Sequence, residues 1–234
     1  MSNPITRLPD YPITRFSRLN AIVDVDVAER AGWTAVDLAS ACVNGGARFL
    51  QIRAKALSGA AFLDLATRVC EIAHRAGAVV VVNDRADVAR LSGADGVHVG
   101  QDDLDAAAAR AVVGAGAIVG RSTHTPAQID AALKEPVTYI AIGPVFDTLT
   151  KTTGYAAVGL DGVRHAAGKI RPAGAPLPVP VSLVAIGGIT LQRAASVIEA
   201  GATSVAVITD LLATGDPAAR VRAYLAMLGE TSNV

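Results

Sequence analysis

Hydrophobic and polar residues follow two alternating patterns along this chain from about residue 18 onward. Short, nearly continuous apolar runs are separated by longer, Ala-rich stretches in which apolar residues recur at helical spacing. Runs that are apolar throughout are typical of parallel strands covered on both faces. The predicted strands are 19–23, 49–53, 79–83, 96–99, 117–120, 138–142, 181–186 and 204–208.

The stretches between these runs predict helices that connect each strand to the next. The predicted helices are 34–45, 58–76, 85–92, 104–113, 126–134, 159–167, 190–200 and 216–228. Strict alternation of strands and helices is most economically arranged as parallel strands with helical crossovers. The pattern therefore predicts an α/β protein, a single-domain (β/α)8 or TIM barrel. A doubly wound open sheet is the alternative, although no Gly-x-Gly-x-x-Gly follows the first strand.

Two segments lie outside this pattern. Residues 1–17 predict an irregular N-terminal arm, and residues 18–230 predict the catalytic barrel domain. The segment 170–180 carries several prolines and cannot continue a helix, so we expect a surface loop there.

Composition and charge narrow the class of partner. The 21 basic and 21 acidic residues are scattered evenly, so the basic stripe of a nucleic-acid-binding protein is missing. No run of 18 apolar residues and no signal-peptide stretch occurs, so we expect a cytoplasmic protein with no membrane partner. Cys42 and Cys70 lie in apolar helical contexts and are expected to be buried thiols, because no metal-binding spacing surrounds them.

Candidate chemistry is sought where the predicted strands end, because active sites of such barrels lie at the carboxyl ends of the strands. Gln51, Arg53 and Lys55 alternate along the end of the second strand and can share one face. A strand end that is basic by chance is the alternative. Three long polar side chains inside a barrel would, however, be costly to bury without a charged ligand.

Acidic residues follow the next two strands. Asn83 and Asp84 follow the third strand, and Asp102 and Asp103 follow the fourth, where each pair could also cap the next helix. Neighbouring strand ends would bring carboxylates side by side. One or two aspartates together with substrate oxygens suit a hard cation, and Mg²⁺ is the natural candidate.

Hydroxyl groups and a lysine follow the fifth and sixth strands. Ser122 is the residue nearest the barrel mouth after the fifth strand, whereas His124 is interpreted as structural. The segment 143–151 contains two threonines, free backbone N–H groups and Lys151, a combination that suits a phosphate or pyrophosphate. A solvated loop is the alternative interpretation of this segment.

A second anion-binding region is predicted after the last two strands. Gly187 and Gly188 lead directly into a helix, and Ile208 and Thr209 end the eighth strand. Barrels often bind a phosphate between these two loops, although a double glycine can also be a simple tight turn. A site with one diphosphate end and one monophosphate end predicts an enzyme that joins two phosphorylated small molecules and releases pyrophosphate.

Six short motifs, met in order, resemble those of the thiamine-phosphate synthase family. The family pattern is Q-x-R-x-K, V-N-D, G-V-H-x-G-Q-x-D, G-x-S-x-H-T, G-P-v-f-x-T-x-T-K and a-I-G-G-I. The matching segments are Gln51–Lys55, Val82–Asp84, Gly96–Asp103, Gly120–Thr125, Gly143–Lys151 and Ala185–Ile189. The order and spacing of the six motifs carry the resemblance, because each alone is unspecific.

The resemblance implies a transferase of thiamine biosynthesis that joins 4-amino-2-methyl-5-hydroxymethylpyrimidine diphosphate to 4-methyl-5-(2-phosphoethyl)thiazole, carboxylated or not. The products would be thiamine phosphate and pyrophosphate. The residues implied to hold the pyrimidine diphosphate are Gln51, Arg53, Lys55, Asn83, Ser122 and Lys151. Those implied to hold the thiazole phosphate are Thr148, Leu149, Thr150, Gly188, Ile208 and Thr209. Catalysis would rest on Lys151, Ser122 and Arg53.

The resemblance also implies Mg²⁺ as cofactor, bound by Asp84 and Asp103. The G-Q-x-D spacing favours Asp103 over Asp102 as the ligand. Thr209 stands where the family more often has serine, and it retains the hydroxyl group. The arm 1–17 and the segment 170–180 are longer than the family pattern predicts.

The family implies a dissociative reaction in which pyrophosphate leaves first and the thiazole nitrogen captures the pyrimidine cation. No general base is needed, which agrees with the lack of an obvious nucleophile–base pair. Three other functions stay open: a thiazole tautomerase that would use His124, a non-catalytic sensor of phosphorylated ligands, and another phosphosugar isomerase or aldolase barrel. The sequence is compatible with a homo-oligomer and does not specify one.

Overall fold

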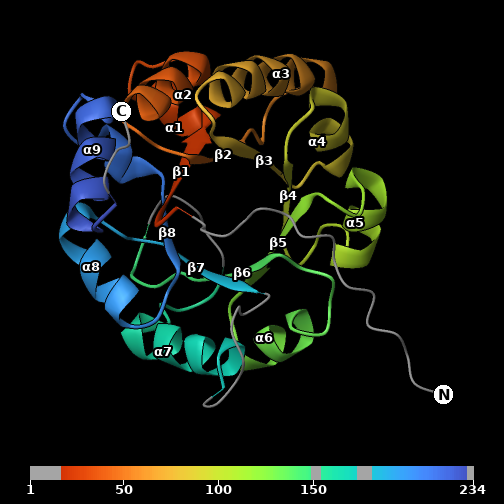
Figure 1. Ribbon diagram of the computed structural model, residues 1–234, viewed down its shortest axis with the longest axis vertical. Coiled ribbons are helices and arrows are strands. Elements are labelled where there is room, and N and C mark those ends of the chain that lie inside the picture. The colour runs from red at the N-terminus through yellow and green to blue at the C-terminus, as the bar shows by residue number, and fades with distance from the viewer. Residues whose placement is uncertain (1–16, 149–153, 173–180, 231–234) are drawn as a thin grey trace.

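The computed structural model describes residues 17–148, 154–172 and 181–230, which form a closed barrel of parallel strands (Figure 1). Each strand pairs with the next along the chain, and the last strand pairs with the first. The strands are β1 (Leu19–Asp24), β2 (Phe49–Arg53), β3 (Val79–Asn83), β4 (Gly96–Val99), β5 (Ile118–Thr123), β6 (Tyr139–Ile142), β7 (Ser182–Ile186) and β8 (Ser204–Val207). The predicted (β/α)8 barrel is confirmed, and the open-sheet alternative is wrong.

A ring of helices surrounds the barrel, as Figure 1 shows. The helices are α1 (Val25–Arg30), α2 (Ala35–Asn44), α3 (Gly59–Arg75), α4 (Ala86–Ser92), α5 (Ala106–Val113), α6 (Pro126–Ala132), α7 (Gly159–Ile170), α8 (Leu191–Glu199), α9 (Pro217–Met227) and the short 3₁₀ helix η1 (Thr209–Leu212). Hydroxyl and carboxylate caps define several helix starts, because their oxygens accept an otherwise unpaired N–H of the first turn. These caps are Asp24, Thr34, Ser58, Asp105, Thr125 and Asp216.

Side chains of each strand alternate between two cores. The larger core lies between the strands and the helices and includes Leu50 and Ile52. The smaller core fills the inside of the barrel and includes Phe49 and Val81. The alternation predicted for β2 is therefore confirmed, because Leu50 and Ile52 face the helices while Gln51 faces the interior.

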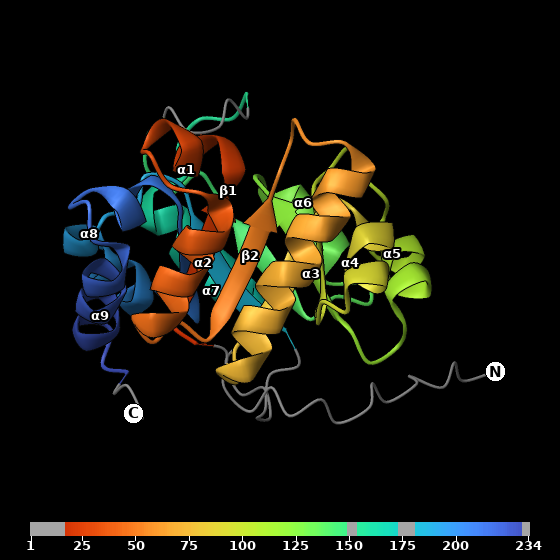
Figure 2. The same cartoon turned by 90° about the horizontal axis from the view of Figure 1, so that it is seen from above.

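Helix α1 was not predicted from the sequence. It follows β1 directly, and the carboxylate of Asp24 caps it by accepting a hydrogen bond from the N–H of Val27. A helix of 6 residues is too short for its periodicity to stand out in the sequence. Figure 2 shows α1 at the end of the barrel toward which β2 points, so it lies beside the carboxyl ends of the strands.

Strand β5 is longer than predicted, and the expectation that Ser122 lies in a loop is wrong. The strand continues through Arg121, Ser122 and Thr123, all of which pair with β6. Polar residues can remain in a buried strand when their groups are bonded. Here the guanidinium of Arg121 donates to the carbonyl of Gly100 at 2.7 Å, and the hydroxyl of Thr123 donates to Ala141 at 3.0 Å.

Gly120, on the interior face of β5, makes room for the ring of Tyr139. A β-carbon at this position would lie 2.1 Å from the Cζ atom of Tyr139, far inside van der Waals contact. The missing side chain lets the tyrosine ring fill the centre of the barrel, where it packs edge-on against Phe49. Gly120 thus determines where the ring of Tyr139 lies, and this ring forms part of the wall of the cavity described below.

Several predictions lie wholly or partly outside the described residues. They concern most of the arm 1–17, most of the segment 170–180, and Leu149, Thr150 and Lys151. Cys42 and Cys70 are buried free thiols, as predicted. Within the described ranges, the helices are all too short or too polar to cross a membrane.

Candidate active site

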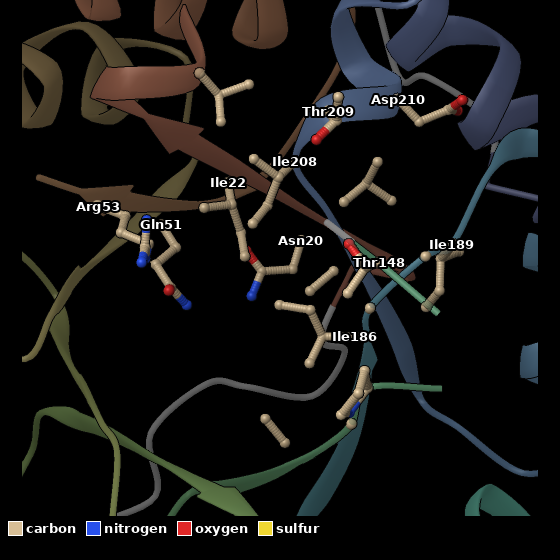
Figure 3. A pocket seen from close by; sticks show the side chains of 18 of the residues that line it. Asn20, Ile22, Gln51, Arg53, Thr148, Ile186, Ile189, Ile208, Thr209 and Asp210 are labelled. Carbon is tan, nitrogen blue, oxygen red and sulfur yellow. The ribbon is translucent and has the colours of Figure 1, made fainter. Parts of the chain in front are cut away.

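A cavity of about 810 Å³ opens at the carboxyl ends of the strands. All eight strands, or the segments that follow them, contribute to its wall. In Figure 3, Gln51 and Arg53 lie on one side, Ile208 and Thr209 lie on another, and Asn20 lies between them. Lys55 and Asp103 do not line this cavity. The strand-end residues singled out in the sequence that do line it are Gln51, Arg53, Asn83, Asp84, Ser122, Thr148, Gly188, Ile208 and Thr209.

The wall formed by β2 carries a buried amide and a partly buried cation. Gln51 is buried, and its side chain lies close to the hydroxyl of Tyr139. Two residues further along, the guanidinium of Arg53 forms an ion pair with Asp24, which is 1% exposed. Lys55 lies beyond the strand end, where its ammonium group pairs with Asp84. Gln51 and Arg53 thus line the cavity, and Lys55 lies beside it through its contact with Asp84.

Asp84 adopts a backbone conformation that few residues tolerate. Its φ of 66° lies in the left-handed region, and it is the only non-glycine residue in the described part of the chain with a positive φ. Aspartate tolerates this region better than most residues. Its N–H donates to the carbonyl of His98 at 2.7 Å, so the turn is anchored to β4. Asp84 is thereby held at the cavity wall next to Asn83.

The carboxylates of Asp84 and Asp103 lie next to each other. The two residues follow neighbouring strands, β3 and β4, as the sequence predicted. Asp103 is an exposed residue, and its carboxylate also accepts a hydrogen bond from the N–H of Gly100 at 2.8 Å. Partial burial and the neighbouring Asp84 raise the pKa of Asp103, while Lys55 acts in the opposite direction. Two adjoining carboxylates favour a bound cation, and the ammonium group of Lys55 offsets part of their charge while no cation is bound.

A polar network lines the deeper part of the cavity. The Nε2 atom of His98 lies 2.8 Å from the hydroxyl oxygen of Ser122, and its ring stacks on Tyr139 with a centroid distance of 5.4 Å. Burial raises the pKa of Tyr139, so its hydroxyl stays protonated and can donate. The Gln101 amide donates to the carbonyl of Ser122 at 2.6 Å and holds β5 from the other side. Flat aromatic faces with donors and acceptors at their edges suit a planar heterocycle.

The opposite side of the cavity is built from backbone. Thr148, Gly188, Ile208 and Thr209 all line it. Gly188 has a φ of +62°, and a β-carbon there would lie 2.6 Å from the carbonyl oxygen of Asp147, so only glycine allows this approach. The start of α8 follows directly, and exposed N–H groups at a helix start favour an anion.

The loops after β6, β7 and β8 are joined into one unit. The N–H of Val145 donates to Ile186 at 2.8 Å, and the guanidinium of Arg193 lies over the ring of Phe146 at 4.7 Å. Asp210 of η1 accepts from the N–H of Leu191, the first residue of α8, at 3.1 Å. These contacts hold together the segments that carry Gly188 and Thr209. Leu149, Thr150 and Lys151, which complete the motif, lie outside the described residues.

Sequence reasoning missed several residues of this site. The residues not singled out are Asp24, His98, Tyr139 and Arg193. His98 and Tyr139 lie within apolar runs and Arg193 within a predicted helix, whereas Asp24 caps a helix that is too short to predict. Their signal is positional: His98 and Tyr139 occupy the interior-facing register of β4 and β6. His124 was interpreted as structural, and its Nδ1–H donates to the carbonyl of Gly143 while its ring stacks on Tyr155.

The fold and the site define a class: a (β/α)8-barrel protein with a large cavity at the carboxyl ends of its strands. Comparison with known proteins narrows this class. The sequence pattern of the thiamine monophosphate synthase family matches residues 19–211. The thiamine-phosphate synthase of Koribacter versatilis is 44% identical over 216 residues, which cover 92% of this chain and 97% of that protein. The chain belongs to the thiamine monophosphate synthase family.

Two further comparisons agree with this membership. The thiamine biosynthesis bifunctional protein ThiM/ThiE of Symbiobacterium thermophilum is 44% identical over 195 residues, which cover 83% of this chain and 39% of that longer protein. A solved structure, thiamine phosphate pyrophosphorylase from Pyrococcus furiosus, superimposes with a TM-score of 0.79 at 23% identity and covers 91% of this chain and 96% of that one. At this identity, the structural likeness supports the fold.

Proposed function

We propose that this protein is a thiamine-phosphate synthase. It joins aminopyrimidine diphosphate to thiazole phosphate, with or without a carboxyl group on the thiazole, and releases pyrophosphate. The observation that carries the proposal is the arrangement of the cavity. Arg53 and the Lys55–Asp84–Asp103 group lie at one end, and the Gly188 backbone with Thr209 lies at the other.

The distribution of residues favours one orientation of the substrates. The diphosphate binds at the ends of β2, β3 and β4, where both cations and both carboxylates lie. The pyrimidine ring, which is attached through one methylene group, lies deeper among Gln51, His98 and Tyr139. The thiazole phosphate binds at the N-terminus of α8 and at η1, so its ring meets the pyrimidine in the middle of the cavity.

The residues at the diphosphate end fit Mg²⁺. Two adjoining carboxylates supply hard oxygen ligands, and the diphosphate supplies further oxygens, which is how proteins usually hold this ion. Among the described residues, no group of three or more potential side-chain ligands occurs, and substrate oxygens and water would complete the coordination. Asp84 and Asp103 would hold the ion, which supplies positive charge to the leaving diphosphate.

The remaining residues assist departure and capture without a general base. Arg53 donates to the leaving diphosphate, and Lys151 has the same role by resemblance to the family motif. The hydroxyl of Ser122 is fixed by His98 and faces the cavity, where it orients the pyrimidine. The cavity walls hold the two rings at reacting distance and exclude water, which would otherwise capture the pyrimidine cation.

An omission assay tests this function. Purified protein is given pyrimidine diphosphate, thiazole phosphate and Mg²⁺, and each is left out in turn while pyrophosphate and thiamine phosphate are measured. We expect both products in equal amounts only in the complete mixture. Metal-independent conversion of thiazole phosphate tautomers without pyrophosphate release would instead indicate a tautomerase. Binding of the ligands without turnover would indicate a sensor.

A further inference from the structure

Asp24 is a buried carboxylate at the end of β1 that the mechanism above does not use. One of its oxygens, Oδ2, accepts from Nη1 of Arg53 in an ion pair. The other, Oδ1, accepts from the N–H of Val27 at 3.0 Å and caps α1. The residue is 1% exposed, so it takes part in these contacts away from bulk water.

The position of Asp24 follows from the strand register. Asp24 and Arg53 are paired residues at the carboxyl ends of β1 and β2, so the two side chains leave the barrel wall side by side. Arg53 lines the cavity and its side chain is 16% exposed. Since Oδ2 of Asp24 engages only Nη1, the other guanidinium N–H groups can reach a ligand in the cavity.

The same carboxylate also contacts the neighbouring wall of the cavity, which is formed by the helix that follows β1. Helix α1, which begins at the Asp24 cap, contributes Val27, Arg30 and Ala31 to the cavity lining. Asp24 therefore connects the cation at the diphosphate end to a helix that borders the remainder of the cavity. A free arginine side chain would lose considerable rotamer entropy on binding a ligand, and a buried ion pair removes most of that cost beforehand.

We propose that Asp24 is a positioning residue that fixes the Arg53 guanidinium for the diphosphate and couples its position to the placement of α1. The inference rests on the proposed function, in which Arg53 binds the leaving diphosphate. A role as a helix cap alone is the competing explanation, because Asp24 also serves α1. The two explanations differ in what they predict for ligand binding.

The first test replaces the carboxylate by an amide in Asp24→Asn. An asparagine has one acceptor oxygen, so it cannot accept from both Val27 and Arg53. We expect the affinity for inorganic pyrophosphate with Mg²⁺, measured by calorimetry, to fall roughly 10-fold or more, as the loss of a charge-assisted hydrogen bond predicts. KM for pyrimidine diphosphate should rise similarly, while KM for thiazole phosphate stays within about twofold.

Asp216→Asn is the matched control. Asp216 caps α9 by accepting from the N–H of Ala219 at 2.9 Å, so this variant reproduces the loss of a carboxylate cap. The control should bind pyrophosphate as the wild type does. If Asp24→Asn also binds pyrophosphate as the wild type does, Asp24 is a cap alone and the inference is wrong.

A double-mutant cycle with Arg53→Gln shows whether Asp24 acts through Arg53. If it does, adding Asp24→Asn to Arg53→Gln should change pyrophosphate affinity by less than about twofold. A further fall equal to that of Asp24→Asn alone would overturn the inference. The binding measurement also separates the two proposals. If Asp24→Asn binds pyrophosphate less tightly than the wild type, but the wild type forms no thiamine phosphate, the positioning role of Asp24 is supported and the proposed function is refuted.

Discussion

Three charged side chains at the diphosphate end of the cavity influence one another directly. Asp84 pairs with Lys55, and the carboxylate of Asp103 adjoins that of Asp84. Two carboxylates in contact disfavour each other's charge, which is part of the reason that the pKa of Asp103 is raised. A bound cation would relieve this repulsion. The two adjacent carboxylates therefore lower the stability of the ligand-free protein and at the same time favour the binding of a cation.

Asp103→Asn should therefore stabilise the ligand-free protein at neutral pH and remove its stabilisation by Mg²⁺. Because folding raises the pKa of Asp103 above its usual value of 3.8, the folded state holds the proton more tightly and stability falls as pH rises through the interval above 3.8. The advantage of asparagine should vanish in acid below this interval and be complete above it. Thermal unfolding across pH, with and without Mg²⁺, measures both effects. Equal Mg²⁺-induced shifts of Tm in the two proteins would contradict the metal site.

Lys151→Ala should lower kcat by about 10²-fold, the usual effect of removing one preorganised donor from a developing charge. The prediction rests on the family motif, since Lys151 lies outside the described residues. Lys169→Ala is a suitable control, because that lysine pairs with Asp130 on the outer helices at 2.9 Å. Steady-state pyrophosphate release measures the effect, and an unchanged kcat would exclude a leaving-group role for Lys151.

Most of the site residues that sequence reasoning found are polar and lie at the end of an apolar run or just after it. The barrel rule then places them at one end of the sheet, as it does for Arg53 and Asp84. Tyr139 begins an apolar run and counts as core until the register shows that its hydroxyl faces the cavity. Asp24 was missed because the helix that it caps is too short to predict. The pattern of apolar and polar residues along the sequence does not predict single residues whose role depends on strand register or on a short helix.

Among the elements, η1, α8 and α9 depend on one carboxylate, that of Asp210. It accepts from Leu191 at the start of α8, from Arg220 of α9 at 2.7 Å, and from the hydroxyl of Tyr224. Burial and this carboxylate raise the pKa of Tyr224, so its hydroxyl remains a donor. The end of the cavity at which we propose that the monophosphate binds is thus supported from outside the barrel by α9.

Asp210→Asn should lower the free energy of unfolding by roughly 2 kcal/mol, because it leaves the mostly buried Arg220 without its partner charge. Asp161→Asn provides the comparison, since its ion pair with Arg164 lies on the surface with side chains 94% and 59% exposed. That variant should change stability by less than about 0.5 kcal/mol. Urea unfolding of both variants tests the difference, and equal effects would show that the Asp210 cluster adds no stability beyond an ordinary surface pair.

The elements themselves were predicted well where their apolar pattern is long. All eight strands and the eight longer helices were found, because each buries a continuous face against the barrel. The end of β5 was missed, since Arg121 and Ser122 look like loop residues until their partners across the strands are known. In both this case and that of α1, contacts between segments distant in sequence decide the outcome.

At the scale of the whole molecule, closure of the barrel brings the ends of the described chain together. β1 pairs with β8 through Leu19–Ala21 and Val205–Val207. Close by, the hydroxyl of Ser17 donates to Glu230 at 2.8 Å, and the guanidinium of Arg18 donates to the carbonyl of Leu228 at 2.9 Å. A ring in which every strand has two neighbours has no edge from which to unfold, so we expect the barrel to open as one cooperative unit.

Cys42 and Cys70 report on this cooperativity. Burial raises the pKa of both thiols to about 12, with smaller effects of Ser92 and Asp95 on Cys70. Neither thiol should react with an aromatic disulfide reagent at pH 8 in the native protein, and both should react together when it unfolds. Free cysteine under the same conditions gives the reference rate. Rapid reaction of one thiol alone in the native state would show that part of the barrel opens separately.

The central claim is that one cavity holds a diphosphate at the ends of β2–β4 and a monophosphate at α8 and η1. A crystal structure with Mg²⁺, pyrophosphate and thiamine phosphate tests it most directly. We predict pyrophosphate on Arg53 with Mg²⁺ between it and the carboxylates of Asp84 and Asp103, and the phosphate of thiamine phosphate at the backbone of Gly188 and Thr209. Pyrophosphate at the Gly188 end, or a metal bound away from both aspartates, would contradict the account.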